Sequence, residues 1–142
     1  MWLLLINPKS GNGRGNKVGK LVKQELKAFG IQYLDVSAGS AQQSQENLTS
    51  RLRGNQKFEG LFLIGGDGTV NLAVQELVGS GLGIALIPAG TGNDFARTLN
   101  LKLKNPEQLI KHHQLMNLFL NRLIFSHVAS ADKSQLRKWT RK

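Results

Sequence analysis

The chain has 142 residues, enough for one compact domain that would bury about 68 to 70% of its unfolded surface. It contains no cysteine, which excludes disulfides and thiolate metal sites and fits a reducing cytoplasm. No stretch approaches the length of a membrane span, and the apolar start at residues 1–6 is too short for a signal peptide. The net charge of +10 is uneven, since residues 121–142 alone carry a net +5.

The first half of the chain alternates apolar runs with amphipathic helical spacing. Residues Trp2–Ile6 form an apolar run typical of a buried strand, and residues 16–29 have the spacing of a helix that ends at Gly30. A second strand is expected at residues 31–36 and a weaker helix at residues 42–53. Each expected strand is therefore followed by a helix.

The second half continues this alternation. A strand at residues 61–64 leads into a helix that runs to Val78, and a strand at residues 83–87 ends at Pro88, which cannot donate a ladder hydrogen bond. Two more helices are expected, one capped by Asn93 or Asp94 and one at residues 106–114. Strands separated by helices imply an α/β fold: a Rossmann-like, doubly wound, mostly parallel sheet with helices on both faces.

Three glycine-rich segments follow three of these strands. They are residues 7–15 (NPKSGNGRG), 65–69 (GGDGT) and 89–94 (AGTGND). In a parallel sheet the carboxyl ends of the strands share one edge, where ligands collect, so the three segments should converge. Glycines let the backbone approach a bulky anion, and free amides at a helix N-terminus favour an anion by about 0.3 to 1 kcal/mol. The sequence therefore predicts a polyphosphate cradle.

Asp67 is the unexpected residue in this cradle. A carboxylate repels a phosphate unless a cation or a sugar hydroxyl lies between them, so Asp67 indicates a magnesium-bound nucleotide. The simpler interpretation is that Asp67 caps the following helix. A dinucleotide site is a third interpretation, since GxGxG follows the first strand and Asp35 lies near the end of the second, but it leaves GGDGT and GTGND unexplained.

The three segments resemble the motifs of the diacylglycerol kinase catalytic domain, in its bacterial lipid kinase group. Residues 7–11 resemble its NPxSG motif, residues 65–71 its GGDGTxN motif and residues 88–97 its PxGTGNDFAR motif. GGDGT is shared with the wider superfamily of NAD kinases and phosphofructokinases, whereas the other two motifs favour the lipid branch. The resemblance covers residues 1–114 and leaves residues 115–142 as a basic tail outside the family fold.

This resemblance implies an ATP-dependent lipid kinase, which transfers the γ-phosphoryl group of ATP, with Mg²⁺, to a lipid hydroxyl such as that of diacylglycerol. It places nucleotide contacts at the following residues: Asn7, Ser37, Gly65, Gly66, Asp67, Gly68, Thr69, Val70, Asn71 and Thr91. Asp67 would reach magnesium indirectly, through the nucleotide. Ser37 stands where the family has threonine, and Leu72 stands where it usually has glutamate, which would weaken magnesium or hinge contacts.

No general base stands out in the sequence. Asp94 is the candidate, although its place in GTGND also suits helix capping, and His112 and His113 lie together on a late helix, where solvent exposure is the simpler interpretation. In the family, the base and part of the metal site resemble contributions from a second, mostly β domain. A chain of 142 residues has no room for that domain, so it is expected to be absent.

Two other functions stay open at this point. The loss of resemblance after residue 114 favours a truncated or frame-shifted gene, whose product would be a nucleotide-binding remnant without turnover. The pI of 10.3 would also suit a basic nucleic-acid-binding module.

The lipid kinase interpretation has its own set of partners. It expects a nucleotide and a lipid substrate at a membrane surface, and no nucleic acid. A basic cluster could either support peripheral membrane contact or be a solvated face: Lys9, Arg14, Lys17, Lys20 and Lys27. The protein is then expected in the cytoplasm, at the inner face of the membrane.

Overall fold

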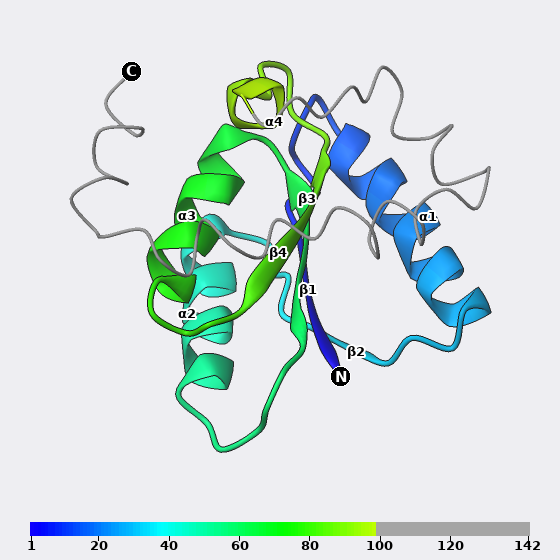
Figure 1. The fold of residues 1–142 in the computed structure, drawn as a ribbon. Helices are drawn as coiled ribbons and strands as arrows, with labels where there is room; N and C mark the ends of the chain where they lie inside the picture. Colours follow the sequence, from blue (N-terminus) through cyan, green and yellow to red (C-terminus); the bar gives the residue numbers. More distant parts are fainter. Residues whose placement is uncertain (99–142) are drawn as a thin grey trace.

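The computed structural model describes residues 1–98, which form a four-stranded sheet in the order β2-β1-β3-β4 (Figure 1). The elements in chain order are β1 (Trp2–Ile6), α1 (Arg14–Ala28), β2 (Tyr33–Asp35), α2 (Ala41–Leu52), β3 (Gly60–Gly65), α3 (Asp67–Leu77), β4 (Gly83–Pro88) and α4 (Asp94–Thr98). All neighbouring strands are parallel. The helix expected at residues 106–114, with His112 and His113, and the tail at residues 115–142 lie outside the described residues.

Each face of the sheet has its own apolar core. Because successive side chains of a strand point to opposite faces, Leu3 and Leu5 of β1 lie in one core and Leu4 and Ile6 in the other. The first core includes the buried side chains of α2 and α3, and the second includes those of α1. Figure 1 accordingly shows α1 on one side of the sheet and α2 and α3 on the other, which confirms the expected doubly wound α/β fold. No helix within residues 1–98 is long and apolar enough to cross a bilayer.

The order of the strands reverses between β1 and β3. From β1 the chain passes through α1 to β2 on one side of the sheet centre, whereas from β3 it passes through α3 to β4 on the other. In open α/β sheets, the crevice outside the carboxyl ends of the strands at such a switch point is where ligands bind. The turns after β1 and β3 lie at this switch point.

Helix α1 ends at the expected place. Gly30 has a φ of 66°, a left-handed conformation that suits glycine, and its amide donates to the Lys27 carbonyl at 3.1 Å. The next amide, of Ile31, donates to the Leu26 carbonyl at 2.9 Å. These two bonds satisfy carbonyls that the helix end would otherwise leave without donors. At its other end α1 begins at Arg14 rather than at residue 16, directly after the left-handed Gly13.

Strand β2 is shorter than the expected residues 31–36. Only Tyr33–Asp35 pair with β1 in register. Beyond Asp35 the Ser37 hydroxyl oxygen accepts a hydrogen bond from the Ile6 amide at 2.8 Å, so a side chain takes over from the strand as the partner of β1. This edge strand therefore stops before the carboxyl end of β1.

A salt bridge ties α1 to β2. The ammonium of Lys23 lies 2.5 Å from Asp35 Oδ2, and Asp35 Oδ1 accepts a hydrogen bond from the Ser37 amide at 2.9 Å. Burial raises the pKa of the Asp35 carboxyl, but the hydrogen bonds from Lys23 and Ser37 outweigh it and bring the pKa below its ordinary value of 3.8. Asp35 is thus engaged by α1 and by its own loop, which does not favour the ribose-binding role of the dinucleotide interpretation.

We expect Asp35→Asn to lower the free energy of unfolding by about 0.2 to 1 kcal/mol near neutral pH, the usual range for an exposed ion pair. Because the folded-state pKa lies below the unfolded one, the contribution of Asp35 is complete above the unfolded pKa and disappears as pH falls through the folded pKa. Urea denaturation of both proteins should therefore show a stability gap at neutral pH that closes well below pH 3.8. A gap of the same size at both pH values would contradict this role.

Candidate nucleotide-binding site

The turns after β1, β3 and β4 lie in backbone contact at the carboxyl edge of the sheet. A Cβ added to Gly11 would lie 2.2 Å from the Ala89 carbonyl oxygen, and one added to Gly90 would lie 2.6 Å from the Gly66 Cα. Both distances are too short for any side chain, so the three turns can approach this closely only with glycine at these positions. We call this region the glycine edge and define it as residues 7–13, 65–69 and 89–93.

Asn7 connects the first turn to the second. Its Nδ2 donates to the Thr69 hydroxyl oxygen at 3.1 Å, and its Oδ1 accepts from the Lys9 amide at 3.1 Å. The Thr69 side chain is buried, with 8% of the residue exposed. Asn7 and Thr69, both expected to contact nucleotide, therefore hold the first turn against the start of α3.

Helix α3 begins inside the GGDGT motif rather than after it. Gly66 is its N-cap residue, without a side-chain cap, and Asp67 and Gly68 form its first turn. Within the part of the chain that the structure describes, the amides of Asp67 and Gly68 have no acceptor. Gly68 is exposed, and a Cβ added to it would meet nothing within 4 Å. A ligand can therefore approach these two donors over open space.

The Asp67 carboxylate holds the third turn in place. Its Oδ2 accepts a hydrogen bond from the Asp94 amide at 3.1 Å, and its Oδ1 accepts one from the Phe95 amide at 3.0 Å. Asp67 thus caps α4, a helix that begins 27 residues later, and the interpretation of Asp67 as a cap for its own helix is wrong. Both carboxylate oxygens of Asp67 are thus engaged by the first amides of α4.

Asn93 closes the third turn and does not cap α4 with its side chain. Its Nδ2 donates to the Gly90 carbonyl at 2.8 Å, and its Oδ1 accepts from the Gly90 amide at 3.0 Å. Asn93 has a left-handed φ of 54°, which asparagine tolerates well. Asn93 holds the N-cap position expected for it, since its carbonyl accepts a hydrogen bond from the Arg97 amide at 3.0 Å, but the side-chain cap of α4 comes from Asp67. An asparagine that follows a glycine is typical of a turn, so the sequence did carry a signal for the turn-closing role of Asn93.

The other residues that were expected to contact the nucleotide differ in how exposed they are. Ser37 reaches the end of β1 through its bond to Ile6, and Asn71 on α3 accepts from the Gln75 side chain at 3.1 Å. Val70 is buried in the core, so only its backbone could face a ligand. Thr91 is exposed at the tip of the third turn.

Asp94 and Leu72 each make a structural contact, so neither side chain needs a catalytic role to account for its place. The exposed Asp94 carboxylate forms an ion pair with Arg97 one turn later on α4. Leu72, in place of the family's glutamate, packs against the core beneath α2 and α3. Residues 1–98 contain no group of three His, Asp or Glu side chains that could hold a metal ion.

We expect Asp67→Ala to destabilise the protein even without ligand, because it leaves two α4 amides without their acceptors. Loss of a helix cap costs about 0.5 to 2 kcal/mol in free energy of unfolding, and Asp67→Asn should lose less because one oxygen acceptor remains. Urea denaturation measures both values, with Gln75→Ala on the exposed side of α3 as a control. An Asp67→Ala protein as stable as the wild type would contradict the capping role.

Comparison with known proteins agrees with this geometry. The sequence profile of the diacylglycerol kinase catalytic domain matches residues 1–119. A diacylglycerol kinase of Mycobacterium tuberculosis is 35% identical over 103 residues, which are 72% of this chain and 33% of the relative. Sphingoid long-chain bases kinase 1 of Arabidopsis thaliana is 31% identical over 112 residues, or 73% of this chain and 14% of the relative.

Human diacylglycerol kinase zeta is 30% identical over 143 aligned residues, which cover 96% of this chain and 13% of the relative. This chain thus spans a third or less of the length of these three relatives. The profile match includes all three glycine-rich turns. The chain therefore belongs to the diacylglycerol kinase catalytic domain family.

Proposed function

We propose that this chain is the nucleotide-binding part of an ATP-dependent lipid kinase, which transfers the γ-phosphoryl group of ATP to a lipid hydroxyl such as that of diacylglycerol. The observation that carries the proposal is the glycine edge, where three turns meet at the switch point of the sheet beside two amides of α3 without acceptors. Membership of a family whose relatives are named as lipid kinases supports the lipid acceptor.

The start of α3 is the proposed phosphate site. The amides of Asp67 and Gly68 point along the helix axis at its positive end, where an anion gains about 0.3 to 1 kcal/mol, or up to about 2 in a sheltered site. Lys9 and Arg14 add exposed positive charge on the turn after β1. Ser37 and Thr91 offer hydroxyls at the rim of the same edge. This chain then binds and orients the phosphates with backbone amides, which do not ionise.

Asp67 can lie beside bound phosphates because its charge is partly offset. The two α4 amides donate hydrogen bonds to its carboxylate and bring positive partial charge to it. Bound Mg²⁺-ATP would supply the γ-phosphoryl group, with magnesium neutralising charge on the phosphate oxygens. Asp67 would stay outside the direct ligand set and would act by holding α4 and the third turn at the correct distance.

The reaction also needs a general base that takes the proton of the lipid hydroxyl. Within residues 1–98 Asp94 is the candidate base, but its ion pair with Arg97 favours a role in holding α4. A nucleotide-binding protein without turnover is therefore the second candidate function. Phosphoryl transfer distinguishes the two, because both bind ATP.

We expect Gly68→Ala to lower ATP affinity about tenfold or more, because the new methyl group occupies the approach to two donors and a hydrogen bond to a charged group contributes about 1.5 to 3 kcal/mol. The free energy of unfolding should stay the same or rise by about 0.4 to 1 kcal/mol, since Gly68 has no left-handed φ and no crowded neighbour. Gly54→Ala is the matched control, because Gly54 lies beyond α2 and its Cβ would make only ordinary contacts. Calorimetry of ATP binding measures all three proteins.

Unchanged ATP affinity in Gly68→Ala, or an equal loss in Gly54→Ala, would contradict the phosphate site. The same proteins also test turnover with radiolabelled ATP and diacylglycerol in detergent micelles. Label transfer by the wild type above the level of Gly68→Ala supports a kinase. ATP binding without label transfer would reject turnover and support the second candidate.

A further inference from the structure

Positive charge in the described part of the chain is concentrated on α1 and the turn before it. Residues 9–29 carry six Lys and Arg side chains and one Glu, a net charge of +5. The other side chains of residues 1–98 include four cations and six carboxylates, a net charge of −2. This part of the molecule therefore has one face that attracts a polyanion, while its remaining surface carries a small negative charge.

The lysines of α1 lie on the side of the helix that faces away from the sheet. At roughly 100° per residue, Lys17, Lys20 and Lys27 fall within an arc of about 80°, opposite the buried Val18 and Val22. Lys20 and Lys27 are exposed and make no ion pair within residues 1–98. We define the basic face of α1 as Lys17, Lys20, Lys23 and Lys27.

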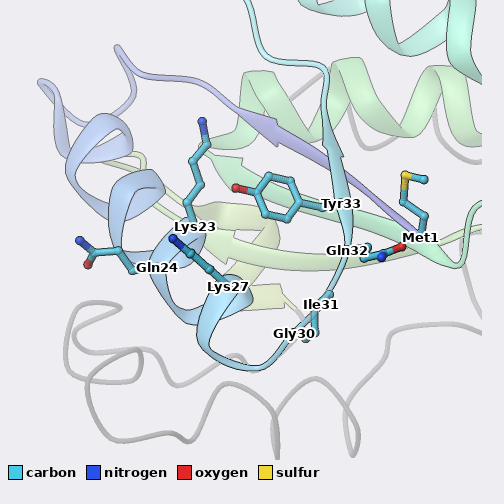
Figure 2. A pocket seen from close by; sticks show the side chains of 8 residues that line it. All are labelled: Met1, Lys23, Gln24, Lys27, Gly30, Ile31, Gln32 and Tyr33. Carbon is cyan, nitrogen blue, oxygen red and sulfur yellow. The ribbon is translucent and has the colours of Figure 1, made fainter.

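The far end of this face borders an open hollow. The hollow has a volume of about 710 Å³, and its lining includes Lys23 and Lys27 of α1 and Tyr33 of β2 (Figure 2). Met1, which also lines the hollow, is 38% exposed. Exposed apolar surface beside lysines is typical of proteins that lie on a lipid surface.

We infer that the basic face of α1 docks on the surface of an anionic lipid bilayer. Lysines near such a surface are attracted by its negative potential. Because α1 starts at the glycine edge, docking along it holds the nucleotide site beside the bilayer. Since a lipid acceptor lies in a membrane, this docking surface rests on the proposed lipid kinase function and specifies how that site meets its substrate.

The test compares two pairs of substitutions in the full chain, each removing two positive charges. Lys20→Gln with Lys27→Gln changes the basic face, and Arg51→Gln with Arg53→Gln changes exposed cations at the end of α2, across the sheet. Co-sedimentation is measured with vesicles of phosphatidylcholine and anionic phosphatidylglycerol, and with phosphatidylcholine alone. The basic residues beyond residue 98 are the same in both variants, so their contribution cancels.

We expect the wild type to bind the anionic vesicles and not the neutral ones. The α1 pair should weaken binding about twenty-five-fold, at about five-fold per lysine, while the α2 pair changes it far less. Equal binding by both variants, or no binding of the wild type to anionic vesicles, would overturn the docking surface. So would a wild type that ignores the vesicles but binds a DNA duplex through Lys20 and Lys27.

ATP affinity, measured on the same preparations, separates this inference from the proposed function. The α1 pair should keep wild-type ATP affinity, because Lys20 and Lys27 lie on α1 away from the glycine edge. Loss of vesicle binding with intact ATP binding therefore supports the docking surface. Intact vesicle binding of the α1 pair rejects the docking surface even if the nucleotide site is confirmed.

Discussion

The close approach of three turns at the carboxyl edge of the sheet is the constraint on which the rest of the site depends. The turns after β1, β3 and β4 come into backbone contact because Gly11, Gly66 and Gly90 have no side chains. Strand order makes this contact possible, since β1, β3 and β4 are adjacent and parallel and therefore end at the same edge. The backbone donors at the start of α3 are then accessible beside two neighbouring turns rather than on an isolated helix end.

A single carboxylate connects this edge to the next helix. Asp67 has the position in GGDGT where a free negative charge would oppose phosphate binding, but its oxygens accept the first amides of α4. The negative charge is thereby used to cap a helix, and the second and third turns are held together. Asn7 makes the corresponding link between the first turn and α3 through Thr69. The site is therefore held by polar side chains within the edge, while its proposed ligand contacts come from the backbone.

Much of the fold could be predicted because its signals are local. Runs of apolar residues such as Trp2–Ile6 indicate buried strands, and Gly30 marks the end of α1. A parallel sheet then requires the three glycine-rich turns to share an edge, although they are far apart in the sequence. The length of β2 was harder to predict, because residues 31–36 look like a strand throughout and pairing stops only where Ser37 bonds to Ile6.

The partners of individual polar side chains could not be predicted from the sequence. A carboxylate in the first turn of α3 normally suggests its own helix as the partner, and nothing local indicates that Asp67 caps a helix 27 residues away. Likewise Asn93 seemed suited to capping α4, but its left-handed backbone turns its amide back to Gly90. Such choices depend on which turns meet in three dimensions, so they become visible only once the sheet order is known.

The central claim is that the glycine edge binds the phosphates of ATP, and an NMR titration of the ¹⁵N-labelled chain tests it most directly. The ligand is a non-hydrolysable ATP analogue with magnesium, and the amide shifts of residues 1–98 are followed. We expect the largest shifts at Asp67, Gly68 and Thr91, which lie on the glycine edge. Shifts confined to the hollow between α1 and β2, around Lys27 and Tyr33, or no saturable shifts at all, would contradict it.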